Sequence, residues 1–200
     1  MVVLGLDPGM TRLGFGAIET HGDKTTFLFH GMICHPREAD IPYNQHLDEG
    51  IRLFTTDFPR VLGMVEPDII CSETVPVGRL GSNTELVVAA ITVCKVIAYQ
   101  WDIPWYNLGA NTIKQSVTGD GLANKTKVRN VVLAEFPTVA DRHKKLKQDQ
   151  KSQGEKRPQG LPQDVFDALA VAMTGAKVHG KVSGREASGP EGSVPALSGL

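Results

Sequence analysis

The chain has 200 residues, a formal net charge of −1 and 41% hydrophobic residues, which is the composition of one globular domain of ordinary size. It contains no run of about eighteen apolar residues, so a membrane span is excluded, and we expect no signal peptide because a basic start and an apolar stretch are missing. The three cysteines are widely spaced without a C-x-x-C pair, so we expect buried reduced thiols in a cytoplasmic protein.

The first predicted strand runs from Val2 to Asp7 and is the centre of the predicted fold. Its apolar run is unbroken until Asp7, and Pro8-Gly9 then ends it. Such a run is typical of a strand buried on both faces of a sheet. A carboxylate at its end is costly to desolvate unless a cation or hydrogen bonds compensate. Asp7 therefore indicates a metal site.

Two further strands, Leu13–Glu19 and Thr25–Ile33, follow tight turns and predict an antiparallel meander with the first. A loop at Pro36–Pro42 precedes a helical pattern from Leu47 to Val65. Because Pro59 lies inside this pattern, we expect either a kink or two short helices.

The fourth strand, Asp68 to Glu73, repeats the opening pattern of an apolar run that ends in an acid. The rules for β–α–β connections make it parallel to the first strand and adjacent to it. Asp7 and Glu73 would then lie side by side at one end of the sheet, where α/β folds place their sites.

A long apolar helix is predicted from Leu86 to about Tyr99, with a capping box formed by Ser82 and Glu85 at its start. A helix that is apolar nearly all round has no face suited to solvent. Two alternatives stay open for its second side: burial within the domain, or the interface of a homodimer.

A short strand at Ile103–Leu108 and helices at Ala110–Val117 and Lys125–Phe136 come next. Because three strands precede an alternation of helices and strands, the class is α/β with a mixed sheet.

A basic stretch follows, which lacks periodicity and predicts a flexible insert at about residues 140–160. From Arg142 to Arg157 seven basic residues outnumber two acidic ones, a local charge of +5. Two bound divalent ions would raise the charge of the whole chain from −1 to +3, so nucleic acid is not excluded as a partner. Two interpretations of the insert stay open: a solvated loop, or a sequence-independent phosphate contact.

The last helix, from Pro162 to about Val178, has Asp164 and Asp167 on one face of its first turn. Acids are also common there because of the helix dipole. Together with Asp7 and Glu73 they would form a group of four carboxylates, which repel one another without a cation. Oxygen ligands without Cys or His specify Mg²⁺, with Mn²⁺ as a substitute. Two such ions about 4 Å apart can activate a water and stabilise the leaving oxygen of a phosphoryl displacement.

Four sequence blocks, in order, resemble the RuvC family of Holliday junction resolvases. The blocks are Gly5–Gly9 with Leu13–Gly16, Ser72-Glu73, Ile113–Gly119 with Ala123–Lys125, and Asp164–Ala172. The resemblance covers residues 1 to about 178 and implies an RNase H-like fold, in which helices cover both faces of a mixed five-stranded sheet. Residues 179–200, rich in Gly, Ser and Pro, are expected to be a disordered tail.

The resemblance also implies roles for individual residues and partners. Asp7, Glu73, Asp164 and Asp167 fall on the four metal-binding acids of the family, and Lys114 and Lys125 fall on its two phosphate-handling lysines. It implies a homodimer that nicks one strand per subunit of a four-way DNA junction with Mg²⁺, and a branch-migration helicase as a further partner.

The chain also departs from the family pattern. Thr74, Val75 and Pro76 follow Glu73, where bacterial members usually have an aromatic residue that opens the junction. The usual Gly- and Arg-containing pattern in the long helix is replaced by Val88–Ile91, and the basic insert is longer than in ordinary members. These differences favour a divergent, phage-type member of the family that is less selective among DNA substrates.

The expected function is therefore a Mg²⁺-dependent, structure-selective endonuclease that resolves four-way junctions by paired nicks through two-metal hydrolysis. One alternative is the same chemistry on forks, flaps or three-way junctions. Another is an actin-like nucleotide-binding protein, which would need a second acid-Gly phosphate turn that this sequence lacks. A relative that only binds nucleic acid is a third, and the presence of all four acids argues against it.

Overall fold

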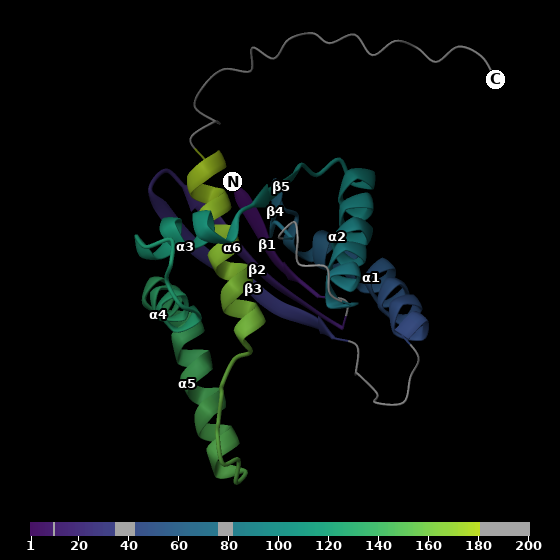
Figure 1. The fold of residues 1–200 in the computed structure, drawn as a ribbon. Coiled ribbons are helices and arrows are strands. Elements are labelled where there is room, and N and C mark those ends of the chain that lie inside the picture. The colour runs from purple at the N-terminus through teal and green to yellow at the C-terminus, as the bar shows by residue number, and fades with distance from the viewer. Residues whose placement is uncertain (10, 35–42, 76–81, 181–200) are drawn as a thin grey trace, which may run out of the picture.

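The computed structural model describes residues 1–9, 11–34, 43–75 and 82–180. Five strands form one mixed sheet in the order β3-β2-β1-β4-β5 (Figure 1). Their bounds are β1 (Val2–Pro8), β2 (Arg12–His21), β3 (Lys24–Cys34), β4 (Ile69–Glu73) and β5 (Trp105–Leu108). The predicted loop at Pro36–Pro42, the part of the predicted loop after Glu73 from residue 76 on, and the predicted tail from residue 181 on lie outside the described residues.

The strand pairing confirms the predicted arrangement of the sheet. β1 pairs antiparallel with β2, which pairs antiparallel with β3, so the first three strands form the predicted meander. β1 is also parallel to β4, with Leu6 opposite Ser72, and β5 is parallel to β4. Asp7 and Glu73 each follow this last paired position, so the two strands deliver them to the same end of the sheet.

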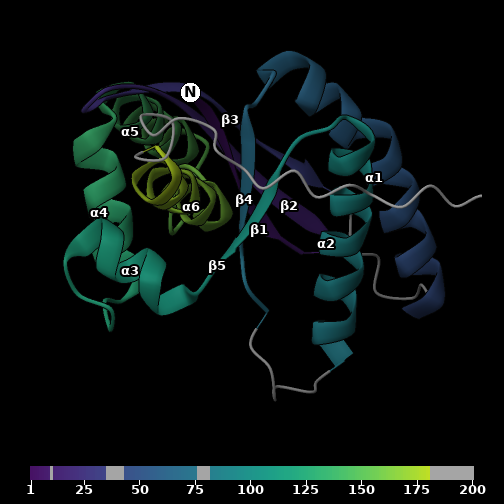
Figure 2. The same cartoon turned by 90° about the horizontal axis from the view of Figure 1, so that it is seen from above.

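Helices cover both faces of the sheet, as predicted. Their bounds are α1 (Tyr43–Val65), α2 (Ser82–Gln100), α3 (Ala110–Thr118), α4 (Lys125–Glu135), α5 (Pro137–Ser152) and α6 (Gln163–His179). Seen from above, α1 and α2 lie on one face and α3, α4, α5 and α6 on the other (Figure 2). Each face has its own cluster of buried apolar side chains, so the sheet is the middle of three layers.

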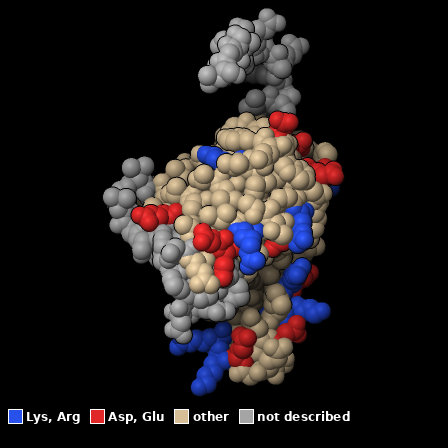
Figure 3. All heavy atoms as spheres, turned by 90° about the vertical axis from the view of Figure 1, so that its right-hand side faces the viewer, with Lys and Arg blue, Asp and Glu red and all other residues tan. Residues whose placement is uncertain are grey.

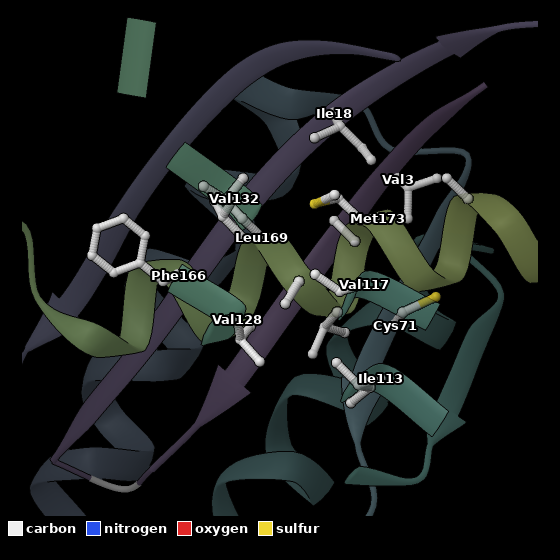
Figure 4. Packing of buried hydrophobic residues seen from close by; sticks show 14 of the residues in the cluster. Val3, Ile18, Cys71, Ile113, Val117, Val128, Val132, Phe166, Leu169 and Met173 are labelled. Atoms are coloured by element: carbon white, nitrogen blue, oxygen red, sulfur yellow. The ribbon is translucent and has the colours of Figure 1, made fainter. Parts of the chain in front are cut away.

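The helix α6 packs closely on the centre of the sheet. Its Phe166, Leu169 and Met173 interdigitate with Val3 and Ile18 of the strands (Figure 4). A Cβ atom placed on Gly5 of β1 would lie 2.1 Å from the carbonyl oxygen of Ala168 in α6. Only glycine therefore allows α6 to approach the central strand this closely.

The basic stretch corrects one prediction, because it is helical rather than a flexible loop. The helix α5 spans Pro137–Ser152, which is most of the insert predicted at about residues 140–160. Lys, Arg and Gln favour helix, and Pro137 suits a first helical position. Val139, His143 and Leu146 recur at the spacing of one helix face, and all three are at least partly buried. The apolar periodicity was hidden because one of its positions is a histidine.

One other helix differs in part from the expectations. The helix α1 is a single helix with Pro59 inside it, so the alternative of two short helices is wrong. Phe54, Phe58 and Leu62 are fully buried on both sides of the proline, and this packing offsets the lost backbone hydrogen bond.

The helix α2 buries one side against the sheet and the neighbouring helix α1. Ala90, Cys94 and Ala98 are fully buried, whereas Val88, Val96 and Tyr99 keep 46%, 51% and 57% of their surface exposed. Burial within one chain therefore accounts for only part of this apolar helix.

No helix in the described ranges is both long enough and apolar enough to cross a membrane. Cys71 and Cys94 are buried free thiols as predicted, whereas Cys34 is exposed.

Candidate functional site

Three elements bring the four predicted acids to one end of the sheet: the ends of β1 and β4, and the first turn of α6. Asp7 pairs with Gly14 of β2, and a Cβ atom on Gly14 would lie 2.5 Å from the carbonyl oxygen of Asp164. The first turn of α6 therefore lies directly on the Asp7–Gly14 pair. A shallow pocket of about 220 Å³ is lined by both Asp7 and Asp164, together with residues of the turn between β1 and β2.

The carboxylates act on one another electrostatically. Burial, followed by the charges of Asp167 and Asp164, raises the pKa of Asp7 from 3.8 to about 7. Burial and the charge of Asp167 also raise the pKa of Glu73. Asp167 is thus close enough to influence both strand acids, and the four side chains form one cluster, here called the acidic cluster.

Basic and amide side chains complete the acidic cluster. Lys125 Nζ donates a hydrogen bond of 2.9 Å to Asp167 Oδ2, and this bond raises the pKa of Lys125. Gln163 Nε2 donates to the other oxygen, Asp167 Oδ1, at 2.9 Å. Arg12 Nε lies 3.5 Å from Asp164 Oδ2. Both helical acids are therefore satisfied by neighbouring side chains.

The position of Lys125 is set by the connection between α3 and α4. Gly119 ends α3 in the left-handed conformation, with φ of 74°, and Asp120 Oδ1 then accepts a hydrogen bond from the N–H of Leu122. Asn124 caps α4 by accepting from the N–H of Lys127 at 2.9 Å, which makes Lys125 the first residue of the helix. The connection is thus closed by local hydrogen bonds, and it places the lysine at a helix N-terminus.

Lys114 lies in the middle of α3 and is less directly involved. Burial and Asp167 raise the pKa of Glu73, and the positive charge of Lys114 partly offsets this rise. Lys114 therefore lies near the acidic cluster. No ion pair of Lys114 occurs among the residues that the structure describes.

The donor set of the acidic cluster fits a hard divalent cation. All four side chains offer oxygen, and a bound cation would offset the burial and the neighbouring negative charges that raise the pKa of Asp7 and Glu73. Among the described residues, the positions of the side chains bring no three His, Cys, Asp or Glu close enough together to bind one metal ion. The ammonium of Lys125 and the guanidinium of Arg12 instead supply the positive charge.

Sequence reasoning missed Arg12 and Gln163 as members of the site. Each had a signal that could have been used. Arg12 begins the strand that pairs with the strand ending in Asp7, and Gln163 lies four residues before Asp167 on the same face of the helix.

Comparisons with known proteins identify relatives of the chain. The family described as crossover junction endodeoxyribonuclease RuvC matches residues 3–148, which ends within α5 and before Asp164. The crossover junction endodeoxyribonuclease RuvC of Synechococcus sp. (strain WH7803) is 31% identical over 175 residues, covering 88% of this chain and 97% of the relative.

Solved structures show the same fold. Thermus thermophilus RuvC in complex with a Holliday junction substrate superposes with a TM-score of 0.65 and 26% identity, covering 88% of this chain and 93% of that chain. The yeast mitochondrial Holliday junction resolvase has a TM-score of 0.57 at 14% identity, covering 91% of this chain and 80% of that chain. These likenesses confirm the predicted RNase H-like α/β fold.

Proposed function

The chain belongs to the RuvC family of crossover junction endodeoxyribonucleases, and from this premise we propose that it resolves four-way (Holliday) DNA junctions by paired, Mg²⁺-dependent nicks. The observation that carries the proposal is the convergence of Asp7, Asp164 and Asp167, with Glu73, on one end of the sheet. We also propose that residues 1–178 form the nuclease domain.

The acidic cluster would hold two Mg²⁺ ions, with Mn²⁺ as a substitute. A bound divalent cation supplies a water of lowered pKa and neutralises charge on the phosphate. The net reaction adds one water across a P–O ester bond, so that the water oxygen joins phosphorus and the ester oxygen leaves with a proton.

The side chains around the acidic cluster prepare it for a phosphate. The pKa of Asp7 is about 7, so without a cation this carboxyl holds a proton for part of the time near neutral pH. Lys125 offsets the charge of Asp167. With a cation bound to the acids, the ammonium of Lys125 would be available to a phosphate oxygen, and Lys114 would add a second positive charge near the acidic cluster.

The homodimer belongs to the same proposal. Two subunits are needed for two nicks on opposite strands, and the exposed side of α2 offers an apolar surface for the contact. The cytoplasmic location and a branch-migration helicase as partner stay predictions.

The alternative of a nuclease with a broader range of branched substrates is favoured by one observation. Thr74 and Val75 follow Glu73, so an aromatic side chain is missing at these two positions of the loop that would meet the centre of the junction. Without stacking on the bases there, discrimination between four-way junctions, forks and flaps would depend on shape and on phosphate contacts alone.

A panel of labelled DNA substrates tests the proposal. Four-way, three-way, flap and linear duplex DNA are incubated with the full chain in Mg²⁺, and then in Ca²⁺ or EDTA. We expect paired nicks in the four-way junction in Mg²⁺ only. Equal cutting of linear duplex would contradict structure selectivity, and equal cutting of all branched forms would favour the broader alternative.

A substitution tests the assignment of the acids. Asp167→Asn should lower the nicking rate by at least about 100-fold, because even the loss of a group supporting a metal ligand costs 10- to 100-fold. Asp23→Asn, in the exposed turn between β2 and β3, is the matched control and should nick at the wild-type rate. Wild-type activity of Asp167→Asn would exclude this residue from the site.

A further inference from the structure

The helix α5 and the segment that follows it, residues 153–157, carry the strongest concentration of positive charge in the chain; this surface is here called the basic arm. Its basic residues are Arg142, Lys144, Lys145, Lys147, Lys151, Lys156 and Arg157. Six of them are exposed and Lys147 is half-buried. None of the seven makes an ion pair in the part of the chain that the structure describes. Figure 3 shows Lys and Arg side chains in blue, with Asp and Glu side chains in red among them, at the lower end of the molecule, where α5 lies.

The inward side of the basic arm is fixed to the return segment that leads into α6. His143 Nδ1 accepts a hydrogen bond of 3.0 Å from the N–H of Leu161, and the His143 ring packs edge-on against Phe166 with centroids 5.3 Å apart. Gln150 Oε1 accepts from the N–H of Gly160 at 2.8 Å. The helix is therefore ordered before any partner binds, so little conformational entropy would be lost on binding.

The basic arm contacts the start of α6 through His143, and it leads away from that end of the helix. The return segment ends at the first turn of α6, which holds Asp164 and Asp167. Figure 1 shows α5 extending past this end of α6 and away from the sheet. With 16 residues the helix is roughly 24 Å long at 1.5 Å per residue. A DNA duplex that leaves the site in this direction would run along the positively charged helix α5.

The chemistry of the outward side favours nucleic acid over a protein partner. Its exposed side chains around Lys144 and Lys145 include Gln148 and Lys151, and also the acids Asp141 and Asp149 one turn on either side of Lys145, but no aromatic or large aliphatic residue. Protein interfaces usually depend on such apolar anchors. Lysines and arginines at successive turns, without apolar neighbours, are instead suited to a row of phosphates.

We propose that the basic arm binds the phosphate backbone of a duplex DNA arm leaving the cut site, without regard to sequence. This inference rests on the proposed function, because it names how the same site gains affinity for DNA. The contact adds to binding and to its salt dependence, whereas hydrolysis stays with the acidic cluster.

Removal of charge from the outward side tests the proposal. The variant Lys144→Gln/Lys145→Gln/Lys151→Gln is compared with a control that loses three charges elsewhere, Lys24→Gln/Arg52→Gln/Arg60→Gln, on β3 and α1. Binding to a four-way junction and to a linear duplex is measured in Ca²⁺ at several salt concentrations. For three lost phosphate contacts the slope of log Kobs against log salt should become shallower by about 2 to 3, and the affinity at moderate salt should fall by at least about 10-fold.

The pattern across substrates and variants decides the outcome. We expect the same fold loss on junction and duplex, no comparable loss in the control, and recovery in Lys144→Arg/Lys145→Arg/Lys151→Arg. Unchanged affinity and slope would overturn the proposal. An equal loss of affinity in the control would also overturn it. So would a loss of affinity for the junction alone, because it would place the basic arm at the branch point instead of along a duplex arm.

Nicking separates this inference from the proposed function. With saturating protein at low salt, the glutamine variant should nick the junction at the wild-type rate, because the acidic cluster is intact. Absence of nicking by the wild type on every branched DNA would refute the proposed function, whereas unchanged binding of the variant would refute only the role of the basic arm.

Discussion

Asp7 shows how a single side chain links the fold to the proposed chemistry. It ends a strand in which Leu4 and Leu6 are fully buried, so its carboxylate is partly withdrawn from water. The charges of Asp164 and Asp167 add to this effect, and the pKa of Asp7 rises from 3.8 to about 7. A proton or a metal cation relieves the same repulsion, so stability and metal binding should be coupled through this residue.

The first prediction concerns the pH dependence of stability without metal. Between pH 3.8 and about 7 the folded state binds more protons than the unfolded state, so Asp7 lowers the free energy of unfolding as the pH rises through this range. Asp7→Asn lacks this titration. In EDTA at pH 7.5, urea unfolding should therefore find the variant more stable than the wild type by on the order of 2 kcal/mol, and the difference should vanish near pH 4.

Magnesium provides the control for that measurement. Mg²⁺ should raise the melting temperature of the wild type and leave Asp7→Asn nearly unchanged, because a ligand stabilises only a protein that binds it. A wild type that is no less stable than the variant at pH 7.5 would contradict the repulsion in the acidic cluster.

The second prediction separates the lysine from the metal ligands. Lys125→Ala removes the hydrogen bond to Asp167, and it should slow nicking about 10- to 100-fold, the equivalent of one charge-assisted hydrogen bond. Its affinity for Mg²⁺, measured by calorimetry, should not fall, because Asp167 becomes free for the ion. Lys127→Ala is the matched control, since Lys127 pairs with Asp120 instead. A parallel loss of Mg²⁺ affinity in Lys125→Ala would argue against a phosphate-handling role.

At the scale of elements, the close contact of α6 with the sheet positions two of the four acids. A Cβ atom on Gly14 would lie 2.5 Å from the carbonyl oxygen and 2.9 Å from the Cβ of Asp164. A methyl group at this point must therefore push the first turn of α6 away from Asp7.

The third prediction follows from this contact. Gly14→Ala should lower the free energy of unfolding by about 1–3 kcal/mol through overpacking, and it should reduce nicking more than stability alone explains. Gly63→Ala in α1 meets nothing closer than 3.7 Å, and it should stabilise the protein by about 0.5–1 kcal/mol because alanine favours helix. Urea unfolding and nicking by both variants provide the check. Full activity of Gly14→Ala would show that α6 can shift without disturbing the site.

The elements that the sequence predicted well are those with a strong local pattern. The apolar runs that end in Asp7 and Glu73 predicted two covered strands, and the rules for β–α–β connections predicted that these strands are parallel and adjacent. The helix α5 was not predicted, because its buried stripe contains His143, whose hydrogen bond to Leu161 depends on a segment eighteen residues away. Periodicity methods count such a histidine as polar.

The acids of the acidic cluster, and Lys125 beside them, were expected from the sequence, whereas Arg12 and Gln163 were not. Acids at the ends of two adjacent strands, and on one helix face, must meet once the topology is known. The pairing of Arg12 with Asp164, and of Gln163 with Asp167, depends on side-chain positions that are set only by packing. The four assigned metal ligands and the two lysines stay predictions until the ion and the DNA are tested.

At the scale of the whole molecule, the exposed side of α2 is the clearest uncovered apolar surface among the residues that the structure describes. Val88, Val96 and Tyr99 lie on one stripe of the helix, at spacings of eight and three residues, and each is about half exposed. A second copy of the chain would cover this stripe with an identical one across a two-fold axis, since such interfaces are self-complementary.

The fourth prediction is that charge on this stripe separates the subunits. Val88→Glu/Val96→Glu should sediment at micromolar concentration with the mass of one chain, whereas the wild type should have the mass of two, because the repelling carboxylates would be buried without partners. Val178→Glu, an equally exposed valine in the last turn of α6, is the control and should leave the dimer intact. The separated subunit keeps its own acidic cluster, so it should retain single nicks on branched DNA and lose their pairing on opposite strands. If the wild type sediments as one chain and still makes paired nicks, the two cuts are not coordinated by a symmetric dimer.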